Sequence, residues 1–136
     1  MLFWIRILSR LPLHALYFLS DTLLYPLMYH VIRYRRSVVS KNLHLSFPNK
    51  TTHELRQLER QFYHHFSDVI VEIIYGYRIS EKEMQERFEF EGVEMVQDIL
   101  GKTGGVLLMM GHLGNWEWTA DMAKRYTNPD ILHYNV

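Results

Sequence analysis

A histidine and a carboxylate stand five residues apart in the segment 111–117, which reads Gly-His-Leu-Gly-Asn-Trp-Glu. A neutral imidazole such as that of His112 can take a proton from a hydroxyl nucleophile. A carboxylate such as that of Glu117 can fix the imidazole tautomer and stabilise the imidazolium. Such general-base assistance is commonly worth ~10²–10⁴ in rate. Because no serine or cysteine stands beside His112, the sequence favours direct attack by a substrate hydroxyl over a covalent acyl-enzyme.

The residues around this pair predict a turn between a strand and a helix. An apolar run predicts a buried strand over 105–110, and the segment after Gly114 predicts a helix over about 114–126. Ligands of open α/β sheets bind beyond the carboxyl ends of strands, and N–H groups near Gly114 and Asn115 could bind an anion. The spacing alone is a weak signal. In the alternative interpretation, His112 is a hydrogen-bonded turn histidine and Glu117 an acid at a helix start.

Helices that would position this turn are predicted upstream of it. Thr51 and Glu54 form a capping-box pattern, and apolar residues recur behind them at helical spacing, which predicts an amphipathic helix over about 51–78. Residues 80–83 predict the cap of a short second helix, and residues 92–100 predict a third, closed by Gly101. The apolar stripe of the long helix comprises Leu55, Leu58, Phe62, Phe66, Val69, Ile73 and Tyr77.

The predicted strands lie at 88–91, 105–110 and 131–136, and helices separate them. This order predicts the α/β fold class: amino-terminal membrane-associated helices and a long amphipathic helix, followed by the start of a right-handed parallel sheet. A sheet of so few strands would leave its edges unprotected. We therefore expect the sequence to be a truncated α/β domain.

The first third of the chain is apolar and basic. Between Arg10 and Arg33 the only formal charge is Asp21. This pattern predicts a membrane anchor over 1–34, made of two short helices joined near Ser20 that lie in or dip into the bilayer face. The alternative is a buried helical hairpin in a soluble protein. On the cytoplasmic side, three arginines would touch anionic head groups: Arg33, Arg35 and Arg36.

Composition restricts the function classes further. Residues 1–50 carry seven Lys or Arg against one acid, whereas residues 51–136 carry eight against fourteen. This asymmetry suggests an anionic membrane surface as partner, and basic residues within an apolar segment argue against nucleic-acid binding. The absence of cysteine excludes a disulfide framework and cysteine catalysis. His64 and His65 diverge as neighbours on a helix, so we interpret them as structural and expect no metal site.

The block 111–117, preceded by Gly104-Gly-Val-Leu-Leu, resembles the His-x4-Asp/Glu motif of the lysophospholipid acyltransferase superfamily. It is closest to the form His-x-Gly-Asn-Trp-Glu of the bacterial lipid A biosynthesis (late) acyltransferases. Upstream, the apolar first segment, the Arg-Arg…Asn-Leu…Phe-Pro pattern at 35–48 and the long helix also agree. The resemblance therefore spans nearly the whole chain.

This resemblance implies an O-acyltransferase in which His112 is the general base and Glu117 its partner. The acceptor would be a hydroxyl of a lipid A precursor or a related membrane lipid. The donor would be a thioester of acyl carrier protein or coenzyme A, which is a co-substrate, so neither a cofactor nor a metal is implied. Gly114, Asn115 and Trp116 match the motif and would shape the substrate site.

The resemblance also implies a location and a domain division. The protein would act at the cytoplasmic face of the inner membrane, with residues 1–34 as anchor and residues 35–136 as the amino-terminal part of the catalytic domain. Family members are roughly twice as long, and their downstream acceptor-binding blocks have no counterpart here. Two alternatives remain: a noncatalytic membrane-binding fragment, and a hydrolase that uses His112 to activate water on a lipid or thioester.

Overall fold

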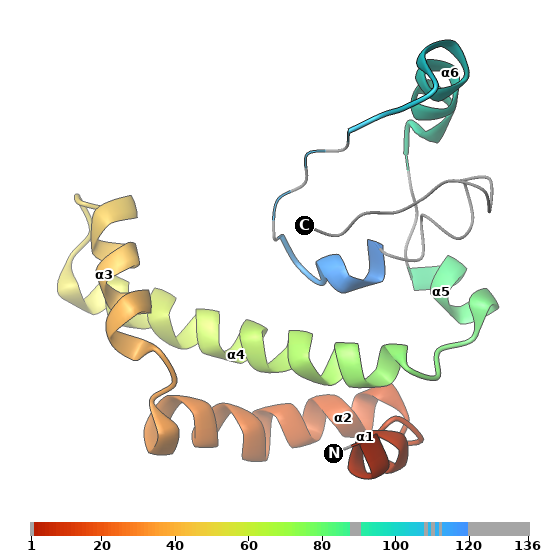
Figure 1. Cartoon of the computed structure of the whole chain (residues 1–136). Helices are drawn as coiled ribbons and strands as arrows, with labels where there is room; N and C mark the ends of the chain where they lie inside the picture. The colour runs from red at the N-terminus through yellow and green to blue at the C-terminus, as the bar shows by residue number, and fades with distance from the viewer. Residues whose placement is uncertain (1, 88–90, 108, 110, 112, 120–136) are drawn as a thin grey trace. The chain divides into compact units, whose positions relative to one another are not determined.

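The computed structural model of the chain describes residues 2–87, 91–107, 109, 111 and 113–119. These residues form helices and turns without any strand, so the predicted α/β fold with a parallel sheet is wrong. The chain divides into two compact units, Met1–Arg78 and Ile79–Val136. In Figure 1 the first unit runs from red to green. The predicted division at residue 34 concerns membrane attachment and stays a prediction.

The predicted strand at 105–110 shows why the sheet prediction failed. A parallel strand depends on a neighbouring strand, which satisfies its backbone N–H and C=O groups and covers its apolar side chains. No such neighbour occurs among the described residues, and Leu107 and Met109 are 86% and 88% exposed. The predicted strand at 131–136 and most of the one at 88–91 lie outside the described residues.

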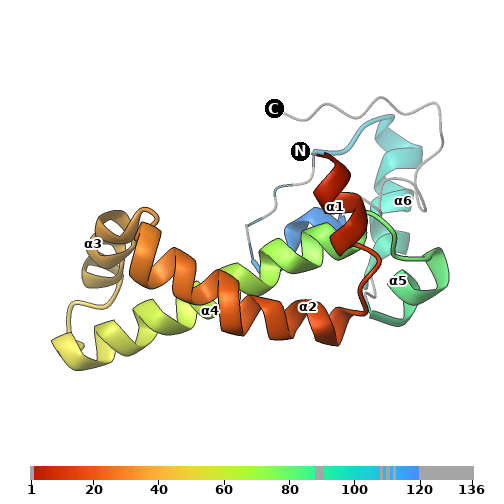
Figure 2. The same ribbon diagram turned by 90° about the horizontal axis from the view of Figure 1, so that it is seen from below.

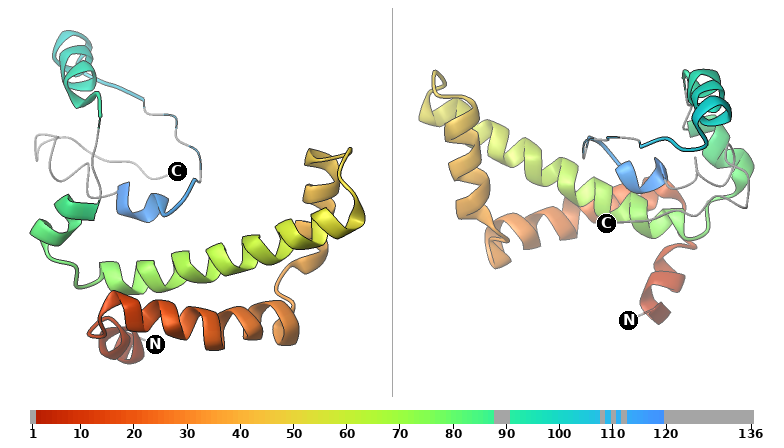
Figure 3. Two further views of the ribbon diagram at one scale, coloured as in Figure 1. Left: turned by 180° about the vertical axis from the view of Figure 1, so that it is seen from behind. Right: turned by 45° about the horizontal axis from the view of Figure 1, so that its top comes forward.

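In the first unit, a helical rod lies antiparallel to a long helix. After α1 (Leu2–Leu8) the chain turns, and Pro12 precedes α2 (Leu13–Leu19). α2 continues without a break into two π-helical segments, η1 (Ser20–Leu24) and η2 (Leu27–Ile32). We call this continuous helical stretch, residues 13–32, the rod. The long helix is α4 (Thr52–Gly76), and α3 (Arg36–Ser46) connects the two. All views show the red-orange rod beside the green helix (Figures 1, 2 and 3).

The predicted joint near Ser20 is wrong, because the rod is continuous there. Pro26 lies inside the rod, and a proline lacks the N–H of a regular helix and crowds the preceding turn. On both sides of Pro26, backbone hydrogen bonds join residues that are five positions apart instead of four. The N–H of Tyr25 donates to the carbonyl of Ser20, and the N–H of Arg33 donates to that of Met28. We attribute the π-helical segments to this proline.

The amino terminus of α4 confirms the predicted capping box. The Thr51 hydroxyl accepts from the Glu54 N–H at 3.3 Å, and the Glu54 carboxylate accepts from the Thr51 N–H at 2.7 Å. Hydrogen bonds from the Thr51 backbone and hydroxyl lower the pKa of the Glu54 carboxyl. The helix that follows has nearly the predicted bounds.

The buried line of α4 differs from the predicted apolar stripe. Glu59, Tyr63 and Ser67 are buried at four-residue spacing, whereas Phe62 is 42% exposed. Ser67 is fully buried, as is Ser20 on the rod. Small side chains allow two helix backbones to approach closely, and this explains why a line containing polar residues can form the contact. Phe62 stacks instead on Phe66 along the flank of the helix, with ring centroids 5.8 Å apart.

Polar contacts align the rod with α4 along its length. The Tyr17 hydroxyl donates to the Glu72 carboxylate at 2.6 Å. Further along, His64 Nδ1 lies 3.2 Å from Asp21 Oδ1, and the His64 ring stacks on Tyr25 with centroids 3.5 Å apart. These contacts give His64 a packing role. Within the described residues, no helix combines the length and the hydropathy needed to cross a membrane.

The second unit contains α5 (Glu81–Arg87), α6 (Val93–Thr103) and the short 3-10 helix η3 (Trp116–Thr119). The Ser80 hydroxyl accepts from the Glu83 N–H at 3.2 Å, which confirms the predicted cap. α6 passes through Gly101, and the predicted closure there is wrong. It ends before Gly104, whose φ of +72° is in the left-handed region that glycine adopts without strain.

We expect Thr51→Ala to lower the free energy of unfolding by about 1 kcal/mol, because α4 loses its hydroxyl cap. Urea denaturation followed by circular dichroism measures this change. Because the pKa of Glu54 is lowered in the folded protein, the ionised carboxylate contributes to the free energy of unfolding. This contribution is fully present above the ordinary glutamate pKa and is lost as the pH falls through the lowered value. The difference between wild type and Thr51→Ala should therefore shrink in acid. Thr52→Ala, one residue on, is the control, and an equal loss there would contradict the capping role.

Candidate functional site

The segment 111–119 carries the predicted active site. The Leu113 N–H donates to the Gly111 carbonyl at 2.9 Å, and the Trp118 N–H donates to the Asn115 carbonyl at 3.2 Å. Between them, Gly114 has φ +59°, which a side chain would strain. The predicted sharp turn into a helical segment is therefore present. The predicted helix over 114–126 is described only for η3, and its remainder lies outside the described residues.

The two predicted catalytic residues differ in what the structure describes. Glu117 lies in the first turn of η3 with an exposed side chain, where its carboxylate can accept a hydrogen bond without a burial cost. His112 lies outside the described residues, so the pairing of His112 with Glu117 stays a prediction. Asn115 and Trp116 are half-buried and Gly114 is exposed. Their predicted role in shaping the substrate site also stays a prediction.

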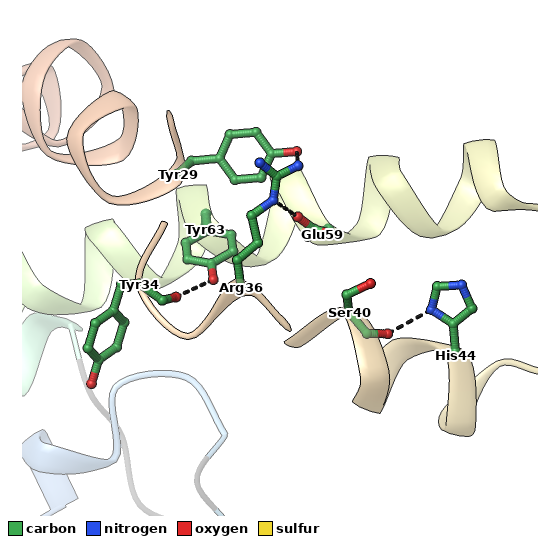
Figure 4. A network of polar contacts seen from close by, with 7 residues as sticks. All are labelled: Tyr29, Tyr34, Arg36, Ser40, His44, Glu59 and Tyr63. Carbon is green, nitrogen blue, oxygen red and sulfur yellow. Dashed lines mark hydrogen bonds and ion pairs between the residues drawn. The ribbon is translucent and has the colours of Figure 1, made fainter. Parts of the chain in front are cut away.

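A second polar cluster, drawn in Figure 4, lies in the first unit. The Arg36 guanidinium donates from Nε to the Glu59 carboxylate and from Nη2 to the Tyr29 hydroxyl, the latter at 3.0 Å. It also lies over the Tyr29 ring, 4.2 Å from the centroid, as a cation–π contact. Beside it, the Tyr63 hydroxyl donates to the backbone carbonyl of Tyr34. The residues of this network come from the rod, from the turn at residues 33–35, from α3 and from α4 (Figure 4).

The electrostatics of the network favour one protonation pattern. The hydrogen bond to the Glu59 carboxylate raises the pKa of Arg36. Burial raises the pKa of the Tyr63 phenol, and the Glu59 charge raises it further. Near neutral pH the guanidinium is therefore charged and the phenol remains a hydrogen-bond donor.

Over the described ranges, no group of three or more His, Asp, Glu or Cys side chains is arranged to hold a metal ion.

Glu59 is the residue of this network that sequence reasoning missed. A signal for Glu59 was available, because it is a carboxylate on the face of α4 that also carries Leu55 and Tyr63, and a buried carboxylate requires a cation. The sequence predicts Arg36, together with Arg33 and Arg35, as a head-group contact. The structure separates the two, because Arg36 pairs with Glu59 inside the unit.

Comparison with known proteins agrees with the motif in segment 111–117. Residues 1–129 match the family model described as bacterial lipid A biosynthesis acyltransferase. The match spans both the first unit and the predicted active-site turn. Neither the curated proteins nor the solved structures gave a match.

We expect Glu59→Leu to lower the free energy of unfolding by about 2 kcal/mol, because Arg36 then remains partly buried without its carboxylate. Urea denaturation followed by circular dichroism measures the loss. The double variant Arg36→Met/Glu59→Leu should recover part of it, since an apolar pair can replace a buried ion pair. Asp98→Asn, which breaks the exposed pair with Lys102, is the control and should cost at most a few tenths of a kcal/mol. Equal losses in Glu59→Leu and Asp98→Asn would refute the role of the buried pair.

Proposed function

Because the chain belongs to the family of bacterial lipid A biosynthesis acyltransferases, we propose that it transfers a fatty acyl group from a thioester to a hydroxyl of a lipid A precursor or related membrane lipid. The family match over residues 1–129 carries the proposal, since it includes the motif at 111–117. The left-handed turn at Gly114 supports it, because it brings the chain sharply from Leu113 into η3, within the motif.

In the proposed reaction, His112 accepts the proton of the acceptor hydroxyl while that oxygen attacks the thioester carbonyl. The new C–O bond forms and the C–S bond breaks, and the departing thiolate takes the proton back from the imidazolium. Glu117 accepts a hydrogen bond from the second ring nitrogen and stabilises the positive charge. Gly114, Asn115 and Trp116 shape the site around the reacting groups.

The donor in this proposal is a thioester of acyl carrier protein or coenzyme A. A thioester is already activated for acyl transfer, so the residues proposed here need to supply only a base and orientation. The reaction as written balances without a metal ion or a resident cofactor.

We further propose that the first unit contacts the cytoplasmic face of the inner membrane. Large apolar side chains lie on the rod away from its buried positions, and Phe18, Leu23 and Val31 are 66%, 62% and 71% exposed. α1 adds the exposed Phe3 and Trp4. Such a group of exposed apolar side chains is typical of a contact surface. An anionic bilayer suits both this surface and the excess of Lys and Arg in residues 1–50.

We expect His112→Ala to lower the rate of acyl transfer about 10²–10⁴-fold, since the general base is lost. Glu117→Gln should cause a smaller loss, because it keeps a hydrogen-bond acceptor but not the charge. Glu94→Gln makes the same chemical change at an exposed position of α6 and should retain full activity. The assay uses membranes that contain the chain, labelled acyl-carrier-protein thioester and a lipid A precursor, with the products separated by chromatography.

Product analysis distinguishes the alternatives. Label in the lipid ester supports the transferase, whereas His112-dependent release of free fatty acid alone would favour the hydrolase. Transfer that survives His112→Ala would refute the base assignment. If the chain has no activity and still binds membranes, the noncatalytic membrane-binding fragment becomes the better interpretation.

We expect the double variant Phe18→Ser/Leu23→Ser to bind vesicles at least about tenfold more weakly. Full burial of one such side chain contributes roughly 1.5–3 kcal/mol, and about 1.4 kcal/mol corresponds to a factor of ten. Co-sedimentation with phosphatidylcholine vesicles measures the change. Met95→Ser/Ile99→Ser removes exposed apolar side chains from α6 and serves as the control. An equal loss in both double variants would contradict the assignment of the contact to the rod.

A further inference from the structure

We propose that a groove between α3 and α4 binds a phosphate group, carried either by the head group of an anionic lipid or by a soluble phosphate ester. The groove has a volume of about 500 Å³. Pockets for small molecules commonly have volumes of roughly 300–1,000 Å³. It lies entirely within the first unit, and its assignment does not require acyl transfer.

The charge of the groove is the first observation that carries this proposal. Arg33, Arg36 and Arg56 line it, against a single carboxylate, Glu59. That carboxylate already pairs with Arg36. Among the described residues, neither Arg33 nor Arg56 forms an ion pair. Two arginines without a carboxylate partner therefore line the groove, and a bound anion with more than one charge could pair with both.

The donor set favours phosphate over a carboxylate. A guanidinium presents a planar fork of N–H donors that fits phosphate oxygens in a bidentate manner. Ser37 and Ser40 of α3 add hydroxyl donors at the same groove. Two arginines and two hydroxyls offer more hydrogen bonds than the two oxygens of a carboxylate can accept. Leu43 and Leu55 supply apolar wall, which suits the carbon part of a phosphate ester.

The backbone that carries Arg33 is the second observation. Arg33 and Arg35 have φ values of 53° and 48°, in the left-handed region that non-glycine residues seldom adopt. Such strain persists only where the surroundings fix it, and it clusters at ligand sites. Here the hydrogen bond of Tyr63 to the Tyr34 carbonyl and the pairing of Arg36 hold the turn. The turn therefore presents Arg33 to the groove in advance of binding, which lowers the entropy lost when a ligand binds.

The test compares two double variants of equal charge change in the full chain. Arg33→Gln/Arg56→Gln removes the two unpaired groove arginines. Arg35→Gln/Arg60→Gln removes one arginine from the same strained turn and one from α4, and neither of these residues lines the groove. Isothermal titration with glycerol 3-phosphate and with inorganic phosphate measures soluble binding. Co-sedimentation with phosphatidylcholine vesicles, with and without phosphatidic acid, measures head-group binding.

We expect the groove variant to weaken phosphate binding by about tenfold or more, since a single hydrogen bond to a charged group is commonly worth about that factor. The phosphate affinity of the control variant should stay within about threefold of that of the wild type. This small loss would come from the removal of two positive charges at a distance from the groove. A groove-dependent gain from phosphatidic acid identifies a lipid head group as the source. Groove-dependent binding of the soluble ester alone identifies a soluble phosphate.

Two results would overturn the proposal. Wild-type protein that binds neither phosphate nor phosphatidic acid saturably has no such site. Equal losses in the groove and control variants would show that diffuse positive charge, and not the groove, attracts the anion. Thermal melts followed by circular dichroism check that the variants are folded. If the groove variant is not folded, Arg56→Gln alone, at an exposed position of α4, replaces it in the same comparison.

Discussion

A carboxylate that is buried on a helix face must pair with a cation. In the first unit, the buried Glu59 pairs with Arg36. Arg36 is the first residue of α3, so its pairing with α4 fixes where α3 begins. Its guanidinium also contacts Tyr29 at the end of the rod. One side chain thus connects the rod, α3 and α4. The intervening turn has two left-handed arginines, and this conformation is held by the Tyr63 hydroxyl at Tyr34, between them, and by Arg36 directly after them.

The contact between the rod and α4 depends on small side chains. Its central positions, Ser20 and Ser67, are fully buried and small, and they let the two backbones approach. The cost is that several large apolar side chains stay outside the contact. Phe62 on α4 and Phe18 on the rod remain exposed. Hydrogen bonds and ion pairs therefore act beside a small apolar core, and many apolar side chains remain available for contacts with a partner.

Structural features that depend on residues close together in the sequence were predictable. Features that depend on contacts between residues distant in the sequence were not. The Thr51 cap and the bounds of α4 follow from local signals and were confirmed. The strand at 105–110 was wrong, because an apolar run becomes a strand only beside another strand. The buried line through Glu59 was missed, since its cation lies 23 residues away in the chain. At the candidate active site, the turn at Gly114 was local and predictable, whereas the pairing of His112 with Glu117 stays a prediction.

The turn between rod and α3 shows how one structural constraint can serve two purposes. Positive φ at two sites separated by one residue would favour glycine, yet the sequence has arginine at both. Replacing arginine by glycine would remove strain but also charge. Arg36 and Arg33 both line the groove, but Arg36 pairs there with Glu59, whereas Arg33, on the left-handed backbone before it, forms no ion pair. If the groove binds phosphate as we propose, this strain has a use: it separates a structural arginine from a ligand-binding one within four residues. An arginine that pairs with one of the protein's own carboxylates has less charge to offer a bound phosphate, so the proposed site depends on the arginines that remain unpaired.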